Sequence, residues 1–600
     1  MNRDSTEGCD GSATLVVLLH AYTHRACNLA SVEDVVRRAW PKADVYRPDL
    51  PASLFSMANP NEIVAKLLID IDEKYLEAQR KAVPYENIVL VGHSLGALLA
   101  RKLYVVACGE VLDAPLEPEF RRDFTQSDPQ PIPTRQWAAK VSRIVLLAGM
   151  NRGWRASHHL SLKHAPFWAL GTVLCHAIHF LTQRWPLIFT IRRGAEFITQ
   201  LRIQWLFMRR RAGSFQRPGT SDSAVWSGGA LTVQLLGSRD DMVAPEDNVD
   251  LVSGGDFIYL DVPYSGHANV VEMDEPTFGP GRTSVFLLAL RGSLQEMRRE
   301  AVVPSDEHFA SPDENVRRMV FVIHGIRDVG YWTHKIARRI KQRAKSPLTE
   351  WATETSSYGY FPMLPFLFPW YRRQKVEWLM DQYAEALARY PNASFSYVGH
   401  SNGTYLLAKA LELYPCCAFD NVVFAGSVVR SSYDWRRFLY ADPPRINAVL
   451  NFVATGDWVV AFFPKFFEII KLQDLGSAGH DGFTVTRRTP KVYQVTYVRG
   501  GHGAAIEEPM WDVIADFVVT GSARVSEVHP VLRKRTLWIE VLGRFPPLVW
   551  TIIAAFAWGI WQGIQWFIQA TVPDAFSQGV VTGFALATYF LVLWLVLTRV

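Results

Sequence analysis

A pattern of buried strand, tight turn and helix occurs twice in this chain and constrains its fold more than any other feature. The pattern reads NIVLVGHSLG over residues 87–96 and SFSYVGHSNG over residues 394–403. Each serine lies between two glycines, which let strand and helix pass closely and lift the hydroxyl clear of a sheet. A serine that simply caps a helix would share part of this pattern. The surrounding sequence has to separate the two interpretations.

Each occurrence lies within an alternation of apolar runs and amphipathic segments. This alternation, with almost continuously apolar strands, predicts parallel sheets covered by helices on both faces, an α/β architecture. The expected strands are 15–19, 87–91, 142–148, 231–236 and 257–262, then 319–323, 394–398, 421–425, 448–454 and 492–498. The expected helices are 62–79, 97–106, 376–390 and 404–413.

An acid and a histidine follow each serine. A serine hydroxyl needs a base, and the base needs an orienting carboxylate, in the chain order serine, acid, histidine. Asp240 and His267 follow apolar strands in the first half, and Asp457 and His502 do so in the second. Asp241 is a rival to Asp240, but the D-x-x-V pattern that begins at both Asp240 and Asp457 favours Asp240.

With these residues the chain resembles the α/β-hydrolase superfamily in its serine lipase or esterase form, over about residues 13–300 and again 316–520. The resemblance implies two catalytic triads, Ser94–His267–Asp240 and Ser401–His502–Asp457. It also implies backbone donors to an oxyanion at Leu95, Ala21 and Tyr22 in the first copy and at Asn402, Gly325 and Ile326 in the second. The usual His-Gly after the first strand is His324-Gly325 in copy two, but His20-Ala21 in copy one leaves the second donor open between Ala21 and Tyr22.

Four further histidines belong to the same motifs. His93 and His400, just before the serines, are expected to pack or bond locally, and His20 and His324 to shape the oxyanion loop. No metal-ligand or phosphate-loop motif is present, so no metal and no cofactor is expected.

The two copies differ between serine and acid. Ser94 and Asp240 are 146 residues apart and Ser401 and Asp457 only 56, so copy one carries about 90 extra residues where the family commonly inserts a lid. The expected lid, about residues 151–228, has eight arginines and one acid between Arg184 and Arg217. Two interpretations stay open: a segment at an anionic lipid interface, or a helical cap with solvated arginines. In copy two, the apolar loop 360–371 is expected to wall an acyl pocket, contact a membrane or pack against copy one.

Two uncharged segments, 548–570 and 579–598, are each long enough to cross a bilayer as a helix. Basic residues flank them: Arg533, Lys534, Arg535, Arg544 and Arg599. The positive-inside rule then places both ends and the hydrolase domains in the cytoplasm, and no secretory signal is expected in residues 1–13. The expected organisation is domain 13–300, linker 301–316, domain 317–520, juxtamembrane linker 521–546 and a transmembrane hairpin 547–600.

The net charge of +5 in 600 residues argues against general nucleic-acid binding. The sequence therefore predicts a membrane-tethered serine hydrolase that cleaves carboxylic esters of lipidic or apolar acyl substrates through an acyl-enzyme. Acyl transfer or thioester cleavage by the same triad is one alternative. A membrane-anchored scaffold without activity is another, because a fold alone does not fix a function.

Overall fold

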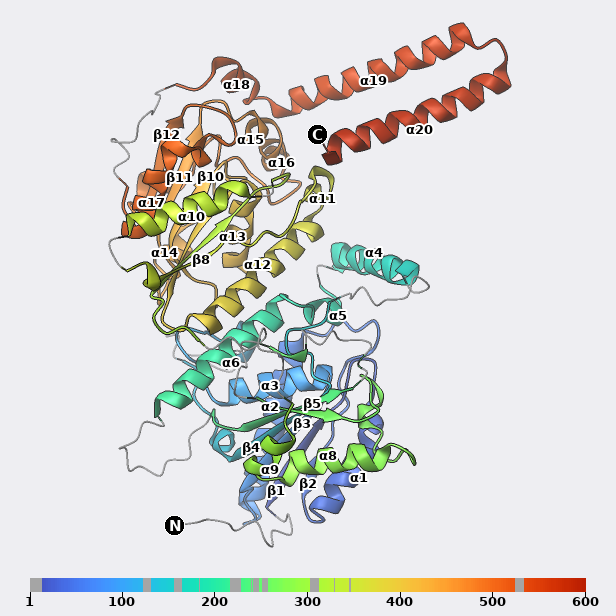
Figure 1. Ribbon diagram of the computed structural model, residues 1–600. Helices are drawn as coiled ribbons and strands as arrows, with labels where there is room; N and C mark the ends of the chain where they lie inside the picture. The colour runs from blue at the N-terminus through green and yellow to red at the C-terminus, as the bar shows by residue number, and fades with distance from the viewer. Residues whose placement is uncertain are drawn as a thin grey trace. The chain divides into compact units, whose positions relative to one another are not determined.

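The computed structural model describes residues 13–121, 131–155, 165–182, 184–215, 228–238, 240, 248–250, 257–302, 312–328, 330–344, 347–523 and 534–599. Parts of the expected lid and of both expected linkers lie outside these ranges, as do Asp241, Arg217 and Arg533. The chain forms two compact units (Figure 1). Unit 1 is Met1–Pro312 with Met380–Pro391 and Tyr414–Cys416, and unit 2 is Asp313–Leu379, Asn392–Leu413 and Cys417–Val600.

Unit 1 contains a parallel sheet of six strands in the order β2-β1-β3-β4-β5-β6. The strands are β1 (Thr14–Leu19), β2 (Asp44–Tyr46), β3 (Asn87–His93), β4 (Val141–Leu147), β5 (Leu231–Gly237) and β6 (Phe257–Val262). Because the strands are parallel, the residues that follow β1, β3, β5 and β6 meet at one edge of the sheet.

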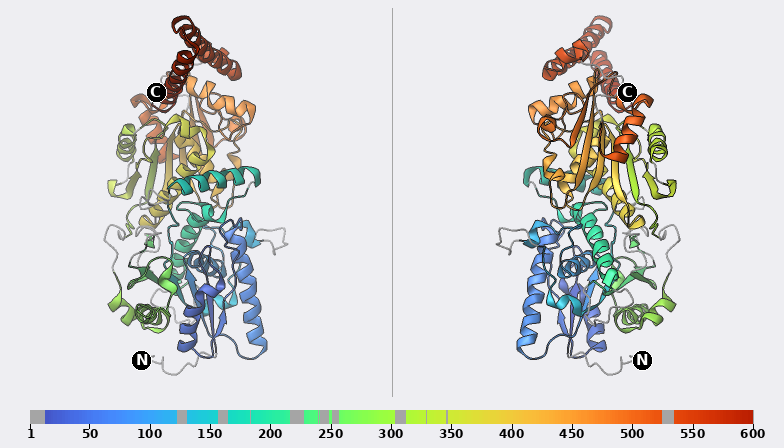
Figure 2. Two further views of the ribbon diagram at one scale, coloured as in Figure 1. Left: turned by 90° about the vertical axis from the view of Figure 1, so that its right-hand side faces the viewer. Right: turned by 90° about the vertical axis from the view of Figure 1, so that its left-hand side faces the viewer.

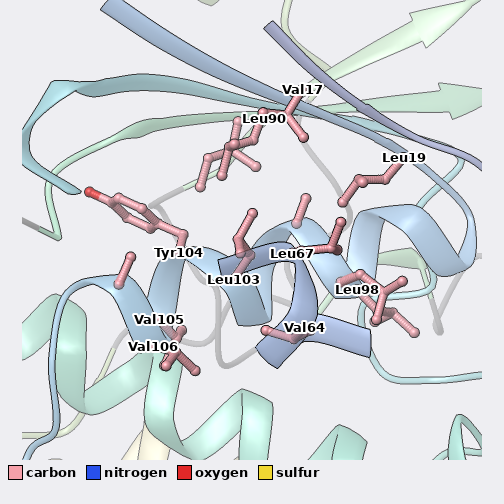
Figure 3. Packing of buried hydrophobic residues seen from close by; sticks show 14 of the residues in the cluster. Val17, Leu19, Val64, Leu67, Leu90, Leu98, Leu103, Tyr104, Val105 and Val106 are labelled. Carbon is pink, nitrogen blue, oxygen red and sulfur yellow. The ribbon is translucent and has the colours of Figure 1, made fainter. Parts of the chain in front are cut away.

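Helices cover both faces of this sheet because its strands are apolar on both sides (Figure 2). Leu15, Val17 and Leu90 pack on α2 (Pro60–Arg80) and α3 (Leu95–Ala107), as Figure 3 shows for part of the cluster. The neighbouring residues Val16 and Val89 face the opposite cluster, which includes α1 (Ala30–Ala39), α8 (Gly279–Arg291) and α9 (Leu294–Glu300).

The extra residues of copy one include α4 (Ala165–Thr182), α5 (Leu187–Thr190) and α6 (Glu196–Phe215). Helix α6 packs on α3 and contributes the fully buried Trp205 to the core. Two of its arginines are held inside unit 1: Arg202 is fully buried against Asp250 and Asp381, and Arg209 donates to the carbonyls of Gly228 and Ala230. The interpretation of these two arginines as solvated or lipid-facing is therefore wrong, because α6 is part of the core of unit 1.

Unit 2 contains a second parallel sheet in the order β8-β7-β9-β10-β11-β12, the same order as in unit 1 when each sheet is numbered from its own first strand. The strands are β7 (Arg318–Ile323), β8 (Trp351–Glu354), β9 (Ser394–His400), β10 (Phe419–Ala425), β11 (Ile446–Ala454) and β12 (Val492–Val498). The principal helices are α10 (Tyr331–Arg343), α13 (Asn402–Leu413) and α17 (Trp511–Thr520). Helix α12 (Pro369–Arg389) belongs to unit 2 up to Leu379 and to unit 1 from Met380. The α/β fold with two parallel, helix-covered sheets confirms the predicted fold class.

Two long helices end the chain, α19 (Pro546–Thr571) and α20 (Ala575–Arg599). Both are long and apolar enough to cross a membrane, and neither is buried within the protein. They lie against each other, with the Tyr589 hydroxyl donating to the Ala557 carbonyl and the Trp561 ring near that of Tyr589 (Figure 1). Trp550, near the start of α19, donates to the Phe462 carbonyl and so holds α19 on the body of unit 2.

Strand and helix lie very close together at the turns after β3 and β9. Ser94 and Ser401 both adopt φ 52°, a conformation that costs a non-glycine residue about 1–3 kcal/mol. The glycines two residues later let the helix lie close to the first strand of its sheet. A Cβ on Gly96 would lie 2.1 Å from the Leu19 carbonyl oxygen, and one on Gly403 would lie 2.6 Å from that of Ile323.

We therefore expect Gly96→Ala to lower the free energy of unfolding of unit 1 by more than about 2 kcal/mol, because the added methyl group meets backbone that cannot move aside. Pulse proteolysis across a urea series measures this loss. Gly171→Ala in α4 is the matched control: a Cβ there meets nothing within 4 Å, so the helix should gain about 0.5–1 kcal/mol or stay unchanged. Equal midpoints for the two variants would contradict the argument.

Candidate active site

Unit 1 brings together three of the residues predicted from the sequence. The Nε2 atom of His267 lies 2.8 Å from the Ser94 Oγ, and its Nδ1 atom lies 3.0 Å from an Asp240 carboxylate oxygen. Ser94 lies between β3 and α3, Asp240 follows β5, and His267 follows β6. All three side chains are nearly buried, so water competes little for these hydrogen bonds.

An open hollow of about 500 Å³ lies beside His267. Its lining includes Tyr264 and Phe278, whose rings stack 4.6 Å apart, together with backbone of the loop that carries His267. Neither Ser94 nor Asp240, both of which the structure describes, lines this hollow.

His93 holds the loop that carries His267. Its Nε2–H donates to the His267 carbonyl at 2.8 Å, and its Nδ1 has no hydrogen-bond partner in the described part of the chain. Burial lowers the pKa of His93 to about 3, so the ring is neutral near neutral pH. His93 thus bonds locally, and its bond ties the turn at Ser94 directly to the backbone of His267.

The loop after β1 is held by a second histidine. The Leu50 N–H donates to His20 Nε2, so the proton of the neutral ring is on Nδ1, which donates to the Ala21 carbonyl. Burial lowers the pKa of His20, which favours this neutral form. Since a trans peptide points its carbonyl and N–H in opposite directions, the N–H of Tyr22 points away from His20.

Unit 2 brings its histidine and acid together but not its serine. His502 Nδ1 lies 2.9 Å and 3.1 Å from the two carboxylate oxygens of Asp457. His400 donates from Nε2 to the His502 carbonyl at 3.2 Å, the counterpart of the bond that His93 makes. No hydrogen bond joins His502 to Ser401, both of which the structure describes.

In unit 2, His502 and Asp457 each stabilise the charged form of the other. Burial lowers the pKa of His502, but the charge and hydrogen bond of Asp457 raise it by more, so that pKa lies above the ordinary value of 6.5. Burial raises the pKa of Asp457, but His502 and the Val460 N–H lower it by more, to below the ordinary value. The pair therefore favours an imidazolium beside a carboxylate.

The loop after β7 approaches Ser401 more closely than a side chain would allow. A Cβ on Gly325 would lie 2.7 Å from the Ser401 Cβ, so glycine is required there. Tyr358 supports this loop: its ring stacks on His324 with centroids 4.4 Å apart, and its hydroxyl donates to the His324 carbonyl. Asn402 in turn donates from its side chain to the Tyr358 hydroxyl at 3.2 Å.

The other backbone groups predicted to donate to an oxyanion lie at the starts of two helices and in the loops after the first strands. Leu95 and Asn402 are the first residues of α3 and α13, where backbone N–H groups have no partner within the helix. Ala21 follows β1, and Ile326 follows Gly325 after β7. Among the described residues, no group of three or more His, Cys, Asp or Glu side chains is arranged to hold a metal ion.

Sequence reasoning missed two residues of these sites. His24 lies with its ring centroid 5.4 Å from that of His93, and burial together with His20 and His267 lowers its pKa. Tyr358, described above, is the other. The closeness of His24 to the His20 motif was the only local signal, and Tyr358 had none, because its contacts join segments more than 30 residues apart.

One protein-family model matches part of the chain. Residues 16–279, less than half of the chain, match the model of the alpha/beta hydrolase family. No curated protein matches the chain. Among solved structures, it is similar to a lipolytic enzyme of metagenomic origin (LipS and LipT), at 11% identity over 48% of this chain and 95% of the other with a TM-score of 0.26.

Two further structures are similar at comparable levels. One is a thermophilic esterase from Thermogutta terrifontis, at 15% identity over 48% of this chain and 91% of the other with a TM-score of 0.24. The other is phospholipase PlaB from Legionella pneumophila, at 14% identity over 38% of each chain with a TM-score of 0.21. The chain therefore has an α/β fold with two parallel sheets, and residues 16–279 in unit 1 are similar to the alpha/beta hydrolase family.

Proposed function

We propose that this protein is a membrane-tethered serine hydrolase that cleaves carboxylic ester bonds of lipidic or other apolar acyl substrates, with unit 1 as its assembled site. The observation that carries the proposal is the chain of hydrogen bonds from Ser94 through His267 to Asp240. A serine that only capped a helix would accept a bond from the helix backbone, but Ser94 makes no such side-chain bond.

In this mechanism the Ser94 Oγ attacks the ester carbonyl carbon while its proton passes to His267 Nε2. The tetrahedral intermediate collapses to an acyl-enzyme as His267 returns the proton to the leaving alcohol. Water then attacks the acyl group, again with His267 as base, and releases the acid and free Ser94. Asp240 fixes the ring with Nδ1 protonated and stabilises the imidazolium that forms.

The oxyanion would be held by the Leu95 N–H at the start of α3 and by one donor of the loop after β1. The bond from His20 to the Ala21 carbonyl favours Tyr22 over Ala21, because it turns the Tyr22 N–H away from the imidazole. The corresponding bond from His324 to the Gly325 carbonyl favours Ile326 over Gly325 in unit 2, with Asn402 as the other donor.

Helices α19 and α20 support the membrane tether and, with it, the lipidic substrate class. Lys534, Arg535, Arg544 and Arg599 around these helices favour cytoplasmic ends and cytoplasmic units. We propose that the two units are tandem copies of one domain, which the shared strand order supports.

Unit 2 has a second candidate role. Because His502 makes no hydrogen bond to Ser401, unit 2 is poised as a resting site whose imidazole has to turn toward the serine, or as a membrane-anchored scaffold without activity. The side chain of His502 is 20% exposed and that of His267 only 6%, which leaves His502 more room to move.

Labelling with a fluorophosphonate probe tests the serines directly. We expect wild-type protein to be labelled at Ser94, and Ser94→Ala to remove that label and to lower ester hydrolysis by unit 1 about 10³-fold or more, because the nucleophile is lost. Peptide mapping locates the label. Ser142→Ala, on β4 of the same unit, is the matched control and should leave both unchanged. Equal turnover by wild type and a Ser94→Ala/Ser401→Ala double variant would end the proposal.

The raised pKa of His502 predicts a pH dependence for Ser401. The imidazole must be neutral to accept the serine proton, so the rate of Ser401 labelling should fall as pH drops through a midpoint above 6.5. Labelling rates of a Ser94→Ala protein across pH 5–9 measure this midpoint. A midpoint at or below 6.5 would mean that Asp457 does not stabilise the imidazolium.

His93 is proposed to be a positioning residue. We expect His93→Leu to lower kcat for a soluble ester about tenfold, because the carbonyl of His267 loses its donor and the base loses its alignment, while KM stays within about twofold. His93→Gln, which can still donate a hydrogen bond, should recover most of the rate. Equal losses in the two variants would assign His93 a packing role alone.

A further inference from the structure

The segment that follows Asp457 in the unit 2 site packs against the start of α19, the first long apolar helix. Asp457 caps the start of α15 (Trp458–Phe462), accepting from the Val460 N–H at 3.0 Å, and α16 (Pro464–Ile470) follows at once. The ring of Trp550 from α19 lies 5.5 Å from that of Phe463 and 5.9 Å from that of Phe466. The acid of the site and the start of α19 are therefore joined by two short helices.

The segment that follows Tyr358 contacts the second long helix. Tyr358 packs on the loop beside Ser401, and the chain runs from there into α11 (Met363–Leu367), which contacts α20. Phe361 and Phe366 in this segment are buried, whereas Tyr360 is 48% exposed. The segments that follow Asp457 and Tyr358 thus both contact the pair of helices α19 and α20. Any bilayer crossed by these helices would have one of its surfaces at this end of the pair.

Apolar side chains remain uncovered at this place. They lie on α15, on α16 with the two residues after it, and on α18 (Leu537–Leu542), elements that contact one another or α19. The exposed side chains, which we call the rim, are Trp458, Ile469, Ile470, Leu472, Leu537, Trp538 and Val541. Leu472 is 69% and Leu537 75% exposed, more than a water-facing surface usually leaves for clustered large apolar groups.

We propose that the rim lies in the interface of the same bilayer that α19 and α20 cross, so that the unit 2 site takes its acyl substrate sideways from that leaflet. This rests on the proposed function and on the proposed tether. Continuity with α19 identifies the occupant as lipid, because the packing of Trp550 leaves the rim next to the start of a membrane-spanning helix. Lys471 and Lys534, exposed beside the rim, suit the phosphate groups of that interface.

The position of the rim can be tested without catalysis. Full-length protein in which Cys9, Cys27 and Cys175 are changed to serine, so that the buried Cys108, Cys416 and Cys417 remain, is reconstituted into phosphatidylcholine vesicles with about 20% phosphatidylserine. A nitrobenzoxadiazole label on Leu472→Cys should be quenched by lipids that carry a nitroxide near the headgroup. The same label on Tyr440→Cys is the control and should not be quenched, because exposed Tyr440 precedes β11 and Asp457 follows it, at the other end of that strand. Equal quenching at the two positions, or failure of the protein to float with the vesicles, would overturn the proposal.

Kinetics separate this inference from the proposed function. In a Ser94→Ala background, Leu472→Asp/Leu537→Asp should lower hydrolysis of a long-chain ester in the vesicles about tenfold or more. Hydrolysis of a water-soluble butyrate ester and labelling of Ser401 should stay within twofold, and Tyr440→Asp should change neither. Equal effects on both esters would overturn the lateral route. Absence of both activities and of Ser401 labelling, with Leu472→Cys still quenched, would instead remove the hydrolase role of unit 2 and with it the route.

Discussion

The close approach of two backbones at Gly96 and Gly403 is the constraint on which both units depend. At each turn a helix begins within van der Waals distance of the carbonyl groups that end the first strand of its sheet. Only residues without a Cβ fit there, and the serine between the glycines is held at positive φ. The strain is tolerated because apolar clusters on both faces fix the strands on either side of the turn.

The same turns also set the position of the bases. In both units the histidine before the serine donates to the backbone carbonyl of the histidine that follows the last strand. Residues 174 positions apart in unit 1 and 102 apart in unit 2 are thus joined by one bond. Burial lowers the pKa of both donor histidines to about 3, so both rings are neutral near neutral pH.

The two units differ in what surrounds this shared frame. Unit 1 has a hydrogen-bonded Ser–His–Asp arrangement, and its extra residues include α6, whose Arg202 is buried against Asp250 and whose Arg209 donates to the Ala230 carbonyl. In unit 2 the histidine lies close to both carboxylate oxygens of the acid but makes no hydrogen bond to Ser401. Segments beside this site contact the two apolar helices. These contrasts favour the proposal that the two sites have different roles in one chain.

Much of the fold follows from the sequence, because apolar strands and glycine turns are local signals. The ten expected strands and the helices after both serines lie where the periodicity predicts them, within a few residues. The short edge strands β2 (Asp44–Tyr46) and β8 (Trp351–Glu354) were not predicted, because three or four residues carry too little periodicity and pair only through a neighbouring strand.

The sequence by itself determined which residue types meet at the edge of each sheet, because parallel strands carry the residues after them to one edge, and the serine, acid and histidine follow strands in a fixed order. Tertiary structure alone decided that the hydrogen bond to serine is made in unit 1 and not in unit 2. It also decided that Arg202 of α6 is buried against Asp250, and that Tyr358 supports the loop beside Ser401. These outcomes depend on distances between segments far apart in the chain, which composition and periodicity do not encode.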